Sequence, residues 1–248
     1  MKLFGKKPVI ERLRANPKSI RQIYIQEGVS ETAYICKKAR HNGISVFIVP
    51  ASKMLKIGRT RNTQGVLGDV ADFEYLPYDE LLESAVEKRR SLLFLDGLND
   101  PQNLGAILRS LACLGKFSVV LPRHDCVDIT ETVLRVSSGG ENYVPVAKVA
   151  NLGQAIKSAK ESGFKIAGAV VKGGENLWEA SFKGLVGLVV GSEQKGIREV
   201  NRNLLDLELT IPMALDILSL NVAQATTILC YEITRQKKIF QAEKKQGR

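Results

Sequence analysis

Residues 92–109 read LLFLDGLNDPQNLGAILR, which predicts a buried strand, a polar turn and a helix in immediate succession. The apolar run from Leu92 ends on the carboxylate of Asp96, and the helical pattern extends from Leu104 to Leu114. Asn103 is a suitable residue to begin this helix, where its amide and the backbone can meet a polar ligand. The segment therefore predicts a strand-to-helix turn that carries polar groups at the end of a buried strand.

The same strand–helix alternation continues to the end of the chain. Further apolar runs cover residues 117–121, 166–171, 185–190 and 207–211, and helical patterns cover residues 152–162 and 219–236. Continuous apolar strands that alternate with helices indicate a parallel sheet covered on both faces. The fold class is therefore α/β, and ligands are expected beyond the carboxyl ends of the strands.

A smaller α/β pattern precedes this part of the chain. Helical periodicity covers residues 9–15 and 31–42, while short β-branched runs cover residues 20–25, 45–49 and 66–71. An acidic and then basic helical connector follows it. We expect a first domain over residues 1–76, a linker over 77–91 and a larger domain over 92–248.

Positive charge is concentrated in the first domain. The whole chain carries a net charge of +10, and residues 1–61 contain fourteen Lys and Arg against three acidic residues. Such a block favours a polyanionic partner, either nucleic acid or an anionic membrane surface. No apolar run is long enough to span a bilayer, and the first residues do not resemble a signal peptide, so a cytoplasmic protein is expected.

Several kinds of chemistry have no sequence support. The four cysteines are far apart, which disfavours a zinc site and is typical of reduced core residues. The chain contains neither GxGxxG nor GxxxxGK[ST], and it has only two histidines. We therefore expect neither a metal nor a redox cofactor.

Two more loops follow predicted strands. Gly191 and Gly196 allow a tight turn around the single acid Glu193. Farther on, Ser219 is a residue type that caps helices, and Asn221 adds a polar group to the first turn of the last helix. Backbone groups at Ile211 and Leu220 could bond an adenine edge. Each loop alone is also typical of ordinary turns.

The order and spacing of the three loops resemble the SpoU (TrmH-like) family of SPOUT RNA 2′-O-methyltransferases. DPQNLGAILRS (100–110) is similar to the first motif of the family, VVGSEQKGI (189–197) to the second, and IPM (211–213) with SLNVA (219–223) to the third. The first domain resembles the small RNA-binding domain, similar to a ribosomal-protein fold, that many rRNA-modifying members carry.

This resemblance implies a C-terminal trefoil knot, a homodimer and S-adenosylmethionine as the cofactor. Gly191, Ile211 and Leu220 would contact the cofactor through their backbones. The matching polar active-site residues are Asn103, Arg109, Glu193, Ser219 and Asn221, with Arg109 acting near the cofactor of the partner subunit. Arg109 could serve as a base or clamp a phosphate, and a guanidinium resists deprotonation.

The sequence departs from the family pattern at Gln194, Leu215, Asp216 and Ala223. The expected function is methylation of a ribose 2′-hydroxyl in structured RNA, with ribosomal RNA the first choice and no DNA partner. The alternatives are a tRNA 2′-O-methyltransferase and a catalytically decayed RNA-binding protein of ribosome assembly. Self-protection against a ribosome-targeting antibiotic would use the same chemistry.

Overall fold

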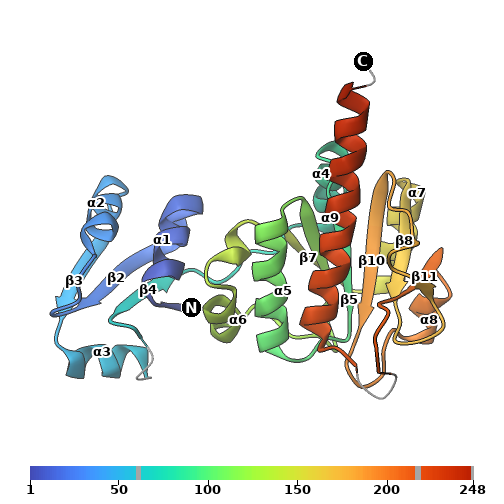
Figure 1. Cartoon of the computed structure of the whole chain (residues 1–248). Coiled ribbons are helices and arrows are strands. Elements are labelled where there is room, and N and C mark those ends of the chain that lie inside the picture. The colour runs from blue at the N-terminus through green and yellow to red at the C-terminus, as the bar shows by residue number, and fades with distance from the viewer. Residues whose placement is uncertain (60–62, 216–218, 247–248) are drawn as a thin grey trace.

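The structure is a computed structural model that describes residues 1–59, 63–215 and 219–246. Two sheets organise the described chain, a small one near the N-terminus and a larger one after it (Figure 1). We call residues 2–70, which contain the small sheet, the N-terminal unit, and residues 78–246 the large-sheet unit.

The large sheet is parallel throughout, which confirms the predicted fold class. Its strand order is β7-β6-β5-β10-β8-β11-β9, and β10 pairs with β5 so that Gly191 lies opposite Asp96. Every other neighbouring pair is parallel as well. The strands are β5 (Ser91–Asp96), β6 (Phe117–Pro122), β7 (Val146–Val149), β8 (Phe164–Ala169), β9 (Glu175–Asn176), β10 (Leu185–Gly191) and β11 (Leu207–Thr210).

Helices cover both faces of this sheet. Along β5, Leu93 and Leu95 belong to one buried cluster and Leu92 and Phe94 to another, as expected for a strand whose side chains alternate between two faces. The first face packs against α5 (Pro101–Leu114), α6 (Glu131–Ser137) and α9 (Val222–Gln246). The second packs against α4 (Tyr78–Glu87) and α7 (Leu152–Glu161), with the short α8 (Glu199–Arg202) beside α7.

The N-terminal unit is built on a mixed sheet of order β1-β4-β2-β3. Strands β2 and β3 are parallel, whereas β4 is antiparallel to both β2 and β1. The strands are β1 (Lys2–Phe4), β2 (Ile20–Gln26), β3 (Ser45–Val49) and β4 (Val66–Val70), and the helices are α1 (Lys6–Ala15), α2 (Ala33–His41) and α3 (Ala51–Gly58). The sequence-based segments at 9–15, 20–25, 31–42, 45–49 and 66–71 all fall on these elements.

The two units are packed together. Arg12 of α1 forms a buried ion pair with Glu141, with 3.1 Å between Nη2 and Oε1 and side-chain exposures of 5% and 0%. Ser137 and Asn142 also donate hydrogen bonds to Glu141, at 2.5 and 3.0 Å. One hydrophobic cluster runs through both units. The segment expected as a linker forms α4, which is buried against the large sheet.

Two expectations about where helices begin were wrong. Helix α5 begins at Pro101, and Asp100 caps it by accepting a bond from the Gln102 N–H at 2.8 Å. Asn103 therefore lies inside the helix. Helix α9 begins at Val222, where Asn221 rather than Ser219 accepts the Ala223 N–H at 2.8 Å.

The cysteines were only partly the expected core residues. Cys230 is buried, Cys113 is exposed, and Cys36 and Cys126 are half-buried. Among the described residues, no helix is both long and apolar enough to cross a membrane.

Replacing Arg12 with Met should weaken the packing of the N-terminal unit against the large-sheet unit. The change leaves Glu141 buried without its cation, which costs about 3–5 kcal/mol for a pair of this kind. Urea denaturation would measure the free energy of unfolding. Arg14→Met is the matched control on the same helix, because the Arg14–Glu11 pair is solvent-exposed and should contribute far less. Equal losses for the two variants would contradict the importance of the buried pair.

Candidate functional site

An apolar pocket of about 410 Å³ lies at the carboxyl ends of the central strands. Its walls come from the segments that follow β8, β10 and β11 and from the start of α9. Its volume is in the range of small-molecule sites. Every predicted residue of the second and third motifs lines it, namely Gly191, Glu193, Ile211, Ser219, Leu220 and Asn221.

A chain of side-chain hydrogen bonds joins the three motifs beside this pocket. The Asn103 Nδ2 donates to Glu193 Oε1, and the Asn221 Nδ2 donates to Asn103 Oδ1 at 3.0 Å. Asn103 is only 9% exposed, so its amide needs partners on both its donor and its acceptor side. The two bonds fix the orientation of that amide and hold the Glu193 carboxylate at the edge of the pocket.

Arg109 does not line this pocket. It lies six residues after Asn103 on α5, which turns it by about 240° around the helix axis. Its side chain is exposed and lines a separate cleft against the N-terminal unit. Within one chain the structure thus gathers Asn103, Glu193, Ser219 and Asn221 and leaves Arg109 apart.

The turn after β10 depends on its two glycines. Ser192 and Gly196 exchange backbone hydrogen bonds of 3.2 and 2.9 Å, which fold the loop back on itself. A Cβ on Gly191 would lie 2.0 Å from the carbonyl carbon of Gly196, and Gly196 itself has a φ of 65°. A side chain at Gly191 would therefore open the turn that presents Glu193.

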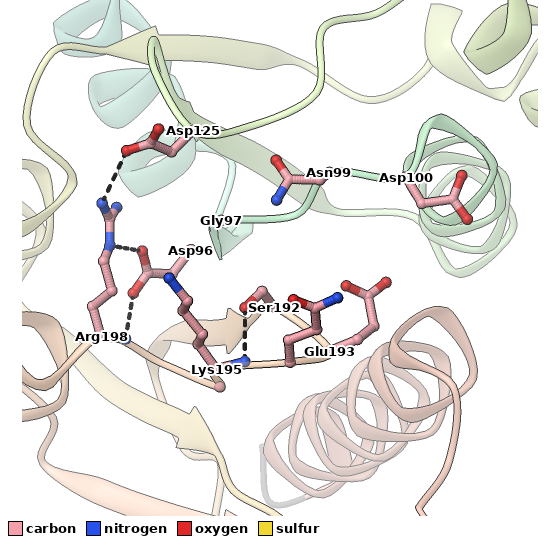
Figure 2. A pocket seen from close by; sticks show the side chains of 11 residues that line it. Asp96, Gly97, Asn99, Asp100, Asp125, Ser192, Glu193, Lys195 and Arg198 are labelled. Carbon is pink, nitrogen blue, oxygen red and sulfur yellow. Dashed lines mark hydrogen bonds and ion pairs between the residues drawn. The ribbon is translucent and has the colours of Figure 1, made fainter.

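Asp96 anchors the far end of the same loop, as Figure 2 shows. Its side chain is fully buried and accepts bonds from the Arg198 backbone N–H at 2.9 Å, from Arg198 Nε at 2.6 Å and from Asn201 Nδ2 at 2.9 Å. From the sequence alone, Asp96 marked only the end of a strand. A carboxylate that closes an otherwise apolar strand was the signal that could have identified it.

A second, polar pocket of about 710 Å³ lies on the other side of this loop (Figure 2). It shares Ser192, Glu193 and Gly196 with the apolar pocket, so the second motif forms a wall between the two. Asn99, Gln194, Lys195 and Arg198 are among its other lining residues. The loop can therefore contact one ligand on its apolar side and another on its polar side.

Two departures from the family pattern, Gln194 and Leu215, leave the apolar pocket open. Leu215 is 56% exposed and does not line it, and Gln194 faces the polar pocket. Asp216 lies outside the described residues. Cys126 follows Asp125 of the polar pocket, and burial raises the pKa of its thiol to about 11, so this group is protonated at neutral pH.

No candidate metal centre was found among the residues that the structure describes: three or more His, Cys, Asp or Glu side chains do not gather anywhere in these ranges.

Two family models together describe most of the chain, and both are models of RNA methyltransferases. Residues 90–231 match the SpoU rRNA Methylase family, and residues 2–76 match a domain described as RNA 2′-O ribose methyltransferase substrate binding. The chain belongs to the SpoU rRNA Methylase family.

Individual proteins agree with this assignment. The 23S rRNA (guanosine-2′-O-)-methyltransferase RlmB of Neisseria meningitidis is 33% identical, and the match covers 98% of this chain and 97% of the relative. An AdoMet-bound rRNA methyltransferase structure from Sinorhizobium meliloti superimposes with a TM-score of 0.78 at 26% identity, covering 94% of this chain and 86% of that one. The SpoU methyltransferase AviRb of Streptomyces viridochromogenes shares the fold at a TM-score of 0.78 and 22% identity, covering 96% and 90%.

Asp96→Asn should loosen the loop that carries the second motif. Hydrogen bonds to a buried charged group contribute about 1.5–3 kcal/mol, so local opening of residues 192–201 should become roughly 10- to 100-fold more frequent. Hydrogen exchange followed by mass spectrometry would measure this opening. Asp125→Asn is the control, because Asp125 is exposed and lies 3.9 Å from the same guanidinium. Unchanged exchange in Asp96→Asn would show that the anchor is dispensable.

Proposed function

We propose that this protein transfers the methyl group of S-adenosylmethionine to a ribose 2′-hydroxyl of structured RNA, with ribosomal RNA as the substrate. The observation that carries the proposal is the Glu193–Asn103–Asn221 chain, which joins three motifs at the edge of one apolar pocket. The name of the Neisseria relative gives the same reaction on 23S rRNA.

The apolar pocket fits this cofactor. Val190, Met213 and Leu229 supply apolar walls, and the side-chain-free backbone of Gly191 allows close approach. In this proposal the backbones of Gly191, Ile211 and Leu220 hold the cofactor, and the C-terminal part of the catalytic domain forms the trefoil knot of the family. The bound cofactor supplies an electrophilic methyl group on a sulfonium, so alignment is the main task of the protein.

The polar residues orient the acceptor hydroxyl. The Glu193 carboxylate, positioned by Asn103, accepts a hydrogen bond from the ribose 2′-hydroxyl and increases its nucleophilicity. Ser219 is exposed at the same pocket and offers a second polar contact. Leu215 lies away from the pocket and the polar chain is intact, which favours an active enzyme over a decayed one.

Arg109 contributes to the reaction through a homodimer. Since it faces away from the pocket of its own chain, we assign it to the site of the partner subunit, where its planar guanidinium clamps a substrate phosphate. The proposed division of labour gives RNA binding to residues 1–76, the connection to 77–91 and catalysis to 92–248. The protein would work in the cytoplasm on RNA, with neither DNA nor a membrane as a partner.

Glu193→Gln should reduce turnover much more than cofactor affinity. The change keeps the shape of the side chain but removes the charged acceptor, and loss of such a group lowers kcat by about 10²–10⁴-fold. Transfer of labelled methyl to rRNA gives kcat, ribose-methylation mapping identifies the product, and calorimetry gives the cofactor Kd. The control is Glu199→Gln on α8, outside both pockets. Wild-type protein that shows no heat with S-adenosylmethionine would instead support the decayed RNA-binding protein.

Mixed dimers test whether Arg109 acts across the subunit interface. Chains with Arg109→Ala and chains with Glu193→Gln should each be inactive alone. When they are mixed and allowed to exchange subunits, half of the dimers are mixed and each of these has one complete site, so about a quarter of the wild-type activity should return. Mixing two batches of Arg109→Ala is the control. No recovery in the mixture of the two variants would place Arg109 in the site of its own chain.

A further inference from the structure

A cleft of about 460 Å³ separates the N-terminal unit from the large-sheet unit at the position of Arg109. One wall is α1, which contributes Lys7, Glu11 and Arg14, and the other is formed by Arg109 of α5 and by the segment around Gly139. It lies apart from both pockets described above, since it shares no lining residue with them.

The cleft has an excess of cations. Lys7 and Arg109 are exposed, and within the ranges that the structure describes neither side chain forms a hydrogen bond or an ion pair. Arg14 is already paired with Glu11 at 2.8 Å and bonded to Tyr34 at 3.1 Å. The single acid in the cleft therefore neutralises Arg14 and leaves Lys7 and Arg109 available to a ligand.

The walls of this cleft are held in place. A Cβ on Gly139 would lie 2.5 Å from the Cβ of Glu11, and a Cβ on Gly140 would lie 2.9 Å from the Cα of Arg109. These two glycines bring the backbone of the segment against both α1 and α5. The buried Arg12–Glu141 pair joins the same two walls. The helices that carry the cations on either side are therefore held in fixed positions relative to each other.

We propose that the substrate phosphate clamped by Arg109 is a backbone phosphate of RNA bound in this cleft, with Lys7 of the N-terminal unit as its second ligand. The proposal rests on the proposed function and deepens it, because it specifies the path by which RNA reaches the site. A phosphate suits the cleft because two unpaired cations face one space and neither offers a hydrogen-bond acceptor. RNA bound by the N-terminal unit would pass along α1 to Arg109.

Lys7→Glu tests the path without touching the proposed catalytic residues. Lys7 lies in the first turn of α1, where a carboxylate is compatible with the helix dipole, so the variant should fold. Filter binding of in vitro-transcribed 23S rRNA between about 50 and 200 mM salt should show at least a roughly tenfold loss of affinity. The slope of log Kd against log salt should fall by at least about one.

Lys157→Glu makes the same change of net charge on an exposed position of α7, on the opposite face of the large sheet. It should lower RNA affinity much less than Lys7→Glu, and equal losses would overturn the proposal. Calorimetry with S-adenosylmethionine separates the two proposals: cofactor binding should be unchanged in Lys7→Glu. If the wild type bound RNA but not the cofactor, the proposed function would fail while the comparison of the two lysine variants would still decide the role of the cleft.

Discussion

The parallel pairing of β5 with β10 is the constraint on which the site depends. It places Gly191 opposite Asp96, so two loops that are almost a hundred residues apart leave the sheet side by side. The Asp96 carboxylate then fixes the second loop by accepting hydrogen bonds from Arg198. Asn103, in the first turn of α5, donates a hydrogen bond to Glu193 of the same loop. Because Asp96 is buried and charged, the loop has few alternative positions: losing Arg198 would leave an uncompensated charge in the interior.

The sequence could predict those features that local patterns encode. Five of the strands in the large sheet coincide with predicted apolar runs, and the short run at Ser45–Val49 matches β3 to the residue. Strands β1 and β9 contain three and two residues, too few for any periodicity to appear. Helix starts were misplaced because several residues near each start can cap, and only the hydrogen bonds distinguish Asp100 and Asn221 from their neighbours. The docking of the units rests on Arg12 and Glu141, whose separation of 129 residues leaves no local signal.

The residues of the candidate site also divide into those that local sequence could predict and those that it could not. Residue types at strand ends indicated Asn103, Glu193, Ser219 and Asn221, and the structure gathers them at one pocket. The position of Arg109 could not be read from spacing alone, because it depends on which face of α5 meets the N-terminal unit. Asp96 was missed for a different reason. Its partners are a backbone N–H, a guanidinium and an amide that lie about a hundred residues later in the chain.

The late chain segments in the pocket wall determine when the protein can first become functional. Val222 and Leu229 of α9 line the pocket, and Asn221 completes the bond to Asn103 across 118 residues. A nascent chain still tethered to its ribosome before α9 has emerged lacks that wall and the last member of the polar chain. Ligand capture therefore requires that α9 has been synthesised, and a polypeptide without α9 is unable to modify the translating machinery that produces it.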